Sequence, residues 1–123
     1  MAKIDSILQQ FRNEIGPDFM ASDVVGVDGI SIAGLVGESH MDVEAFAARA
    51  AMVMKLGSRV SDKLGLGKLE DNLTTTDKSI VITRSLGSGE YFWGVAVTKD
   101  AVLGTVRMVM GEFADQVWDA IPR

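Results

Sequence analysis

The sequence predicts an α+β fold in which helices cover both faces of a single five-stranded antiparallel sheet, in the order α-β-β-α-β-β-β-α. Two observations lead to this fold. Apolar residues recur with helical spacing in three segments, and five further segments are short alternating or β-branched runs typical of strands. The connections between successive strands are of hairpin length, which implies antiparallel pairs, and helices of this length must cover a sheet face. The 123 residues suit one domain spanning 1–123.

The first helix and the first hairpin follow directly from local patterns. Residues 4–15 place apolar side chains at helical spacing until a Gly-Pro pair ends the helix. Strands are expected over 21–27 and 30–36, separated by Asp28 and Gly29. An Asp-Gly pair between two apolar runs is a strong hairpin signal, because glycine supplies the positive φ of the turn. Asp28 is therefore interpreted as a turn residue and not as a catalytic base or metal ligand.

The longest helix is predicted from Met41 to Leu64, after a capping-box spacing at 39–42. Steps of three or four residues define a stripe that we expect to face the sheet: Phe46, Ala50, Val53, Gly57, Val60 and Leu64. The opposite stripe should face solvent: Glu44, Ala48, Met52, Lys55, Arg59 and Asp62. Between 45 and 54 only Arg49 is polar, so this part of the helix should be buried on nearly every side.

Three strands and a helix complete the chain. Residues 68–75 are mostly polar and predict an edge strand, whereas 78–86 and 91–98 have the β-branched and aromatic residues of buried strands. Alternation along the last strand should send Phe92 to one face of the sheet and its two aromatic neighbours to the other. The last helix is expected over 102–120, with one apolar side.

The composition excludes several classes of function. The formal net charge is −5 and the basic residues are scattered, whereas nucleic-acid binding requires a basic face. The chain has no cysteine, so disulfides, thiolate metal sites and cysteine nucleophiles are excluded. Its first residues lack the apolar core of a signal peptide, and no uncharged stretch approaches the roughly 20 residues that span a bilayer. We expect a cytoplasmic protein without nucleic-acid binding or direct membrane insertion.

No motif indicates an enzyme, a metal site or a cofactor. His40 is the single histidine and has neither a nucleophile nor a second imidazole in a recognisable context. A group of carboxylates could in principle hold a divalent cation but lacks the spacing of a calcium loop: Asp23, Asp28, Glu38, Asp42 and Glu44. The glycine-containing segments 64–68 and 86–90 lack the residues of a phosphate-binding loop. We therefore expect no catalytic, metal-binding or cofactor-binding residue.

One small sheet cannot cover both sides of the long helix, but a second copy of the chain could. We predict a homodimer with 45–54 in or beside the interface and with the polar edge strand available to pair with its twin. The residues expected at this interface are Ala45, Ala48, Ala51, Met52, Leu69, Asp71 and Leu73. The alternative is that alanine, a good helix former, tolerates exposure.

Four segments together resemble the roadblock/dynein light chain family: VVGVDGISIAG, EAFAARAAMVMKLGSRV, YFWGVAVTKDAVLG and the final helix. The resemblance covers nearly the whole chain and rests on element order and diffuse patterns, with a first hairpin tighter than in many members. It implies a three-layer domain whose copies dimerise through the long helix and the neighbouring edge strand. It also implies a non-enzymatic protein, because members regulate small Ras-like GTPases, form dynein subunits or scaffold GTPases at membranes.

In the gliding-motility branch of this family the paired long helices bind the GTPase. By position, the resemblance implies partner contacts at Arg49, Met52, Lys55 and Arg59, beside Ala48. We interpret Arg49 and Arg59 as surface residues and not as arginine fingers, because nothing in the sequence marks either as one. Two alternative functions stay open: a small-molecule-sensing signalling module and a structural assembly subunit.

Overall fold

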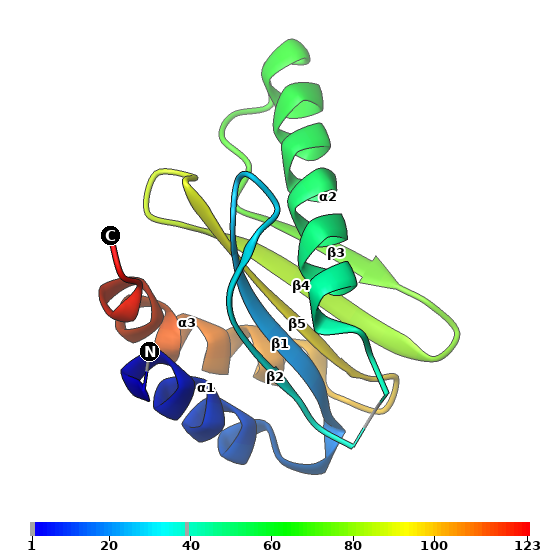
Figure 1. Ribbon diagram of the computed structural model, residues 1–123. Helices are drawn as coiled ribbons and strands as arrows, with labels where there is room; N and C mark the ends of the chain where they lie inside the picture. The colour runs from blue at the N-terminus through cyan, green and yellow to red at the C-terminus, as the bar shows by residue number, and fades with distance from the viewer. Residues whose placement is uncertain (1, 39) are drawn as a thin grey trace.

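The computed structural model describes residues 2–38 and 40–123, and its elements follow the predicted order (Figure 1). The helices are α1 (Ala2–Ile15), α2 (Val43–Lys63) and α3 (Leu103–Ala120), with a 3-10 turn, η1 (Gly16–Asp18), after α1. The strands are β1 (Phe19–Gly26), β2 (Ser31–Val36), β3 (Asp71–Thr75), β4 (Ser79–Leu86) and β5 (Tyr91–Thr98). All neighbouring strands are antiparallel, in the order β2-β1-β5-β4-β3, which confirms the predicted α+β fold.

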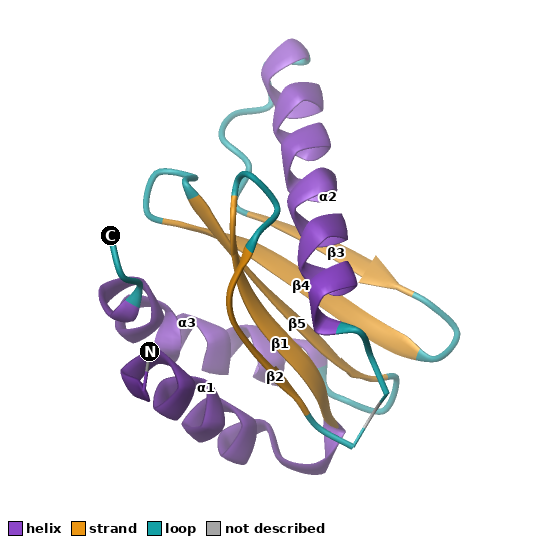
Figure 2. Ribbon diagram, viewed as in Figure 1, coloured by secondary structure: helices purple, strands orange, loops and turns teal. Residues whose placement is uncertain are grey.

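The sheet lies between two unequal helical layers. Helices α1 and α3 cover one face, and α2 alone crosses the other (Figure 2). The larger apolar core fills the space between the sheet and the α1–α3 pair. At its centre the fully buried Phe11 ring meets Trp93 and Phe113 edge-on, with centroid distances of 4.9 and 5.7 Å. The indole Nε1–H of Trp93 donates to Ser22 Oγ at 2.8 Å, so its polar atom is satisfied inside this core.

The layer beneath α2 holds a smaller buried cluster than the core on the other face of the sheet. Its buried cluster consists of Val25, Ala47, Ala51, Met54 and Phe92, with Leu69 packed against it. Phe92 belongs to this cluster, whereas Trp93 belongs to the core on the other face, which confirms the alternation expected along β5.

The connection between β1 and β2 is the Asp-Gly turn that the sequence predicts. Gly29 has a φ of +84°, and its N–H donates to the Gly26 carbonyl at 2.9 Å. Asp28 Oδ1 accepts a hydrogen bond from the Ile30 N–H at 3.0 Å. The Asp28 carboxylate therefore stabilises the turn itself, as turn aspartates commonly do.

The bounds of α2 and β3 differ slightly from the prediction. Helix α2 begins after Asp42, whose Oδ1 accepts hydrogen bonds from the N–H groups of the second and third helical residues at 3.1 and 3.2 Å. Ser39, the other end of the expected capping box, lies outside the described residues. Strand β3 begins at Asp71 and not at Lys68, but it is an edge strand, as predicted.

Replacing Phe11 by alanine should destabilise the protein by about 3–5 kcal/mol, because the substitution removes a buried ring that joins α1 to both α3 and the sheet. Urea unfolding followed by tryptophan fluorescence measures this loss. Gln10→Ala, on the exposed side of the same helix, should change stability by less than about 0.5 kcal/mol. Equal losses in the two variants would contradict the packing described.

Candidate interaction surface

A row of small or short residues crosses all five strands beneath α2. Gly34 of β2 pairs with Asp23 of β1, which in turn pairs with Gly94 of β5. Thr83 of β4 and Asn72 of β3 continue the same register to the other edge. Register neighbours share a face of the sheet, so Gly94 on the central strand β5 and Gly34 on the edge strand β2 both present bare backbone on the face that α2 covers.

Helix α2 lies directly on this bare backbone. A Cβ atom at Gly34 would overlap Val43 Cγ1, and a Cβ atom at Gly94 would lie 3.2 Å from Phe46 Cζ. The helix itself presents mainly alanines at its buried positions. The glycines leave room for the side chains of Val43 and Phe46, so these two residues of α2 reach the backbone of the strands.

The stripe of α2 predicted to face the sheet is wrong in phase. The residues that the helix buries are Ala47, Ala50, Ala51 and Met54. Of the predicted stripe, Phe46, Ala50 and Gly57 do contact the sheet or Leu69. Val53, Val60 and Leu64 are exposed. The buried face is shifted by about one residue from the predicted stripe, which corresponds to a rotation of about 100° about the helix axis. The large aliphatic side chains of the stripe therefore lie outside the contact with the sheet.

The outward side of α2 therefore carries an apolar patch, which we call the outer α2 surface. Its five large side chains are 40–67% exposed: Met52, Val53, Leu56, Val60 and Leu64. The last turns of α2 also extend beyond the strands, so no sheet lies beneath them (Figure 1). Contiguous exposed apolar side chains of this kind mark interaction sites on soluble domains.

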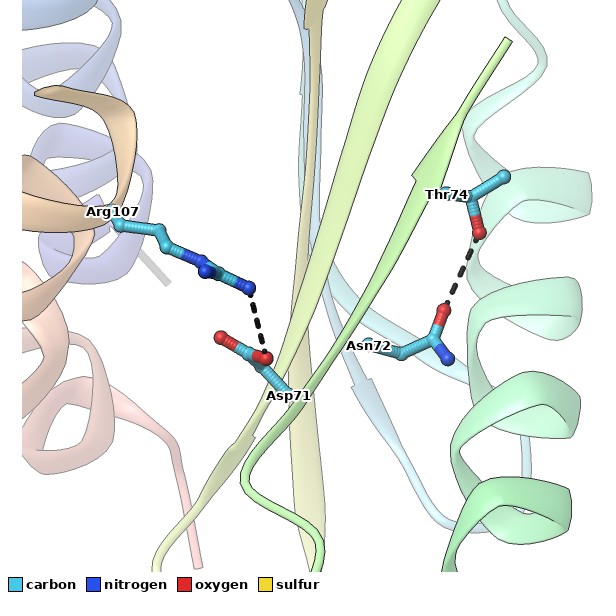
Figure 3. A network of polar contacts seen from close by, with 4 residues as sticks. All are labelled: Asp71, Asn72, Thr74 and Arg107. Carbon is cyan, nitrogen blue, oxygen red and sulfur yellow. Dashed lines mark hydrogen bonds and ion pairs between the residues drawn. The ribbon is translucent and has the colours of Figure 1, made fainter. Parts of the chain in front are cut away.

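Strand β3 is the edge of the sheet on one side of this surface, and its side chains alternate between the two helical layers (Figure 3). Asp71 accepts a hydrogen bond from Arg107 of α3 at 3.2 Å. Asn72 and Thr74 point toward α2 and are joined by a hydrogen bond of 3.3 Å. As an edge strand, β3 offers its outer main-chain groups for pairing with another strand.

A hollow of about 160 Å³ lies between α2 and the strands β3 and β4. Phe46, Arg49 and Val53 line it from the helix, and Asn72 and Thr83 line it from the sheet. The hollow joins the outer α2 surface to the face of β3. Helix flank, hollow and strand edge therefore form one continuous surface that a second chain could cover.

The sequence-predicted site residues fall into different environments. Arg49, Met52, Lys55 and Arg59 are exposed on α2. The predicted interface residues Ala45 and Ala48 are half-buried on the same helix, and Leu73 of β3 is 39% exposed.

Three predicted interface residues have contacts within the chain. Ala51 is 1% exposed because it lies against the sheet, so it offers no surface to a second copy and is removed from the predicted interface. Leu69 is partly covered by α2, where a Cβ at Gly57 would lie 3.1 Å from Leu69 Cδ2. Asp71 keeps part of its surface but is paired with Arg107.

Asp23 is the buried acid that the sequence analysis grouped with other carboxylates and did not single out. It is 1% exposed, and its Oδ1 accepts a hydrogen bond from Ser31 Oγ at 2.7 Å. Its Oδ2 has no hydrogen-bond partner in the part of the chain that the structure describes. Burial raises the pKa of Asp23 from 3.8 to about 7, and the hydrogen bond from Ser31 opposes this rise. The sequence feature that indicates its burial is the position of this acid within a mostly apolar strand.

The other groups considered for chemistry are dispersed. Among residues 2–38 and 40–123, no three histidine, cysteine or carboxylate side chains come together as a metal site. Asp42 caps α2, Asp28 stabilises a turn, and His40 is exposed. None of the described helices is long and apolar enough to cross a membrane.

No protein-family model and no curated protein sequence matches the chain. Solved structures do match it. MglB of Myxococcus xanthus has a TM-score of 0.85 at 15% identity, covering 97% of this chain and 94% of that one. An MglB structure with a tetrameric arrangement has a TM-score of 0.86 at 12% identity, with coverage of 98% and 88%. A Roadblock/LC7 domain from Streptomyces avermitilis has a TM-score of 0.82 at 18% identity, with coverage of 92% for both chains.

The chain has the roadblock fold. At these identities the likeness concerns the fold, and it agrees with the resemblance found in the sequence. Within the roadblock fold, the outer α2 surface and the β3 edge lie on the long helix and edge strand to which that resemblance assigned dimerisation.

Replacing Asp23 by asparagine should flatten the dependence of stability on pH. The raised pKa means that the folded state holds its proton from about pH 4 to about pH 7 while the unfolded state loses it. The unfolding free energy of the natural chain should therefore fall as pH rises through this window and stay low above it. One pKa unit is worth about 1.4 kcal/mol, so the loss is at most about 4 kcal/mol.

Urea unfolding at pH 4.5 and at pH 8 measures this effect, and Asp23→Asn should be the more stable protein at pH 8. Asp77→Asn, at an exposed acid in the β3–β4 turn, serves as the control and should follow the natural chain. If Asp23→Asn loses stability with rising pH as steeply as the control, Asp23 is not the source of the dependence.

Proposed function

We propose that this protein is a non-enzymatic homodimeric regulator or scaffold that binds a small Ras-like GTPase through its paired α2 helices. The observation that carries the proposal is the outer α2 surface beside the open edge of β3. The roadblock fold supports it, because the sequence resembles a family whose members act on or beside such GTPases. The MglB structure with a tetrameric arrangement supports self-association.

The geometry of a symmetric dimer follows from the edge strand. Pairing β3 with its twin about a twofold axis would join the two sheets and place both α2 helices on one face, side by side. The flank of α2 that overlies β3 would then meet its twin, and the hollow near Asn72 would be closed. Of the predicted contacts, Ala45, Met52, Asp71 and Leu73 are kept for this dimer. Ala48 lies beside Gly29 of the β1–β2 turn and Leu69 lies beneath Gly57, so both are away from the β3 flank. We add Val53, Leu56 and Val60, because they are large, apolar and exposed.

The GTPase would bind on the paired helices through Arg49, Met52, Lys55 and Arg59. All four side chains are exposed on α2. The three cations have no ion-pair partner in the described part of the chain, where the one ion pair joins Arg107 to Asp71. They share the exposed side of α2 with the acids Glu44 and Asp62, so this surface offers groups of both charges to a partner.

The alternative of a structural assembly subunit shares the dimer and lacks the GTPase. The alternative of a small-molecule-sensing module requires a pocket, and the hollow beside Met54 and Phe92 is the candidate for one. If this protein stimulates GTP hydrolysis, we expect it to do so by ordering the catalytic residues of the GTPase itself.

A charge placed on the dimer flank should dissociate the protein. Val53→Glu combined with Val60→Glu would bury two carboxylates against their twins, which should raise the dissociation constant by about a hundredfold or more. Sedimentation velocity at micromolar concentration should show twice the 13.2 kDa chain mass for the natural protein and a single chain for the variant.

Met108→Glu is the matched control, because Met108 is an apolar residue of α3 that is 59% exposed on the opposite layer. It should leave the dimer intact. A natural chain that sediments only as a 13.2 kDa species would refute the dimer.

A tagged copy of the chain should capture a small GTPase from native lysate when a GTP analogue is added, and mass spectrometry identifies it. Met52→Ala combined with Arg59→Ala should reduce capture by about tenfold, because both side chains leave the contact. Capture of the chain alone, in both nucleotide states, would favour the structural subunit instead.

The double variant Arg49→Ala and Arg59→Ala tests the role of the arginines in any stimulated hydrolysis. Stimulation should weaken in proportion to binding, because neither arginine is expected to contact the transferred phosphate. Complete loss of stimulation with binding intact would show that one of them is an arginine finger.

A further inference from the structure

A second hollow, of about 180 Å³, lies on α2 where the helix meets the two hairpin turns. Met54, Leu69 and Phe92 form its apolar floor, with Val27 of the β1–β2 turn beside them. Met54 and Phe92 are buried members of the cluster under α2. The floor is therefore fixed by the same packing that holds the helix on the sheet.

The rest of the lining carries cations and hydroxyl groups and no carboxylate. Lys55 reaches the hollow from α2, and Lys68 reaches it from the segment before β3. Ser58 and Ser88 add hydroxyl groups from α2 and the β4–β5 turn, whereas the Ser85 hydroxyl donates to the Leu69 carbonyl at 3.4 Å and joins the two walls. Groups from separate parts of the chain thus place donors and positive charge around one apolar base.

Neither lysine is neutralised by the protein itself. In the described part of the chain, Lys55 and Lys68 belong to no ion pair. Glu90, in the adjacent turn, is engaged by the Ser88 N–H, which donates to its Oε1 at 3.1 Å. An adjoining hollow shares Lys68 and adds Arg84, whose Nε is buried without a hydrogen-bond partner among the described residues, and Glu70.

We propose that this hollow binds a small amphipathic anion, with an apolar ring or short chain on the Met54–Phe92 floor and a phosphate or carboxylate group between Lys55 and Lys68. An apolar cavity of about 150 Å³ holds a benzene molecule, so the volume of about 180 Å³ suffices for one ring. Charge-assisted hydrogen bonds from the lysines supply orientation. The proposal goes beyond the GTPase function and does not depend on it.

Amide chemical shifts of the isotopically labelled full chain test the proposal with four probes: phenyl phosphate, benzoate, phenol and inorganic phosphate. Phenyl phosphate or benzoate should shift the amides of Leu69, Ser88 and Phe92. Phenol lacks the charge and inorganic phosphate lacks the ring, so both should bind at least about tenfold more weakly. Whichever of the first two binds more tightly identifies the anionic group.

Substitutions separate this site from general attraction of anions. Lys55→Gln with Lys68→Gln should weaken phenyl phosphate and benzoate by about tenfold or more. Lys63→Gln with Lys78→Gln makes the same change of charge at exposed lysines that do not line the hollow, and should leave binding within about twofold. Ser58→Phe should abolish binding by filling the hollow, with the melting temperature unchanged.

Any of the following results would overturn the proposal. The first is the absence of any shift at the hollow up to about 10 mM of phenyl phosphate and of benzoate. The second is phenol binding as tightly as the anions, which would remove the role of the lysines. The third is unchanged binding in the Lys55→Gln, Lys68→Gln variant, or shifts confined to the α1–α3 layer. None of these results bears on GTPase binding, which is measured separately by capture.

Discussion

The contact between α2 and the sheet determines which surfaces of this protein stay exposed. It depends on Gly34 and Gly94, where any Cβ atom would meet a side chain of the helix. The helix seated on them buries three alanines and Met54. Its larger aliphatic side chains, Val53 and Val60 among them, therefore lie on the outside. The outer α2 surface therefore follows from which side of the helix faces the sheet.

The same contact between α2 and the sheet buries Asp23 and raises its pKa. Its two register neighbours are glycines, so the carboxyl group lies among residues that leave room for it but offer one hydrogen bond, from Ser31. An unsatisfied buried oxygen costs stability, which is the physical origin of the raised pKa. The chain thus keeps a destabilising group where α2 meets the sheet.

The sequence predicts the order of the elements and the edge position of β3, because periodicity and polarity are local properties. It also predicts that 45–54 is too apolar for one covered face. It places Phe46, Ala50 and Gly57 correctly but rotates the contact face of α2 by about one residue, because apolar spacing determines the period of a helix more firmly than the direction of its buried face. Ala47 and Ala51 have small side chains that occur on buried and on exposed helix faces, so the sequence does not identify them as the residues that contact the sheet. The hollow between Lys55 and Lys68 depends on the convergence of separate segments, which no local pattern encodes.

The two proposed sites share Lys55, and this has a thermodynamic consequence. If one lysine contacts both the GTPase and a small anion, the two ligands cannot use it together, and each weakens the other by the same factor. The coupling must be reciprocal for binding free energies even though the apolar parts of the two sites are separate. Dimerisation would be unaffected, because the flank over β3 and the flank beside the hairpin turns are different sides of α2. A small anion would therefore regulate the partner and not the assembly.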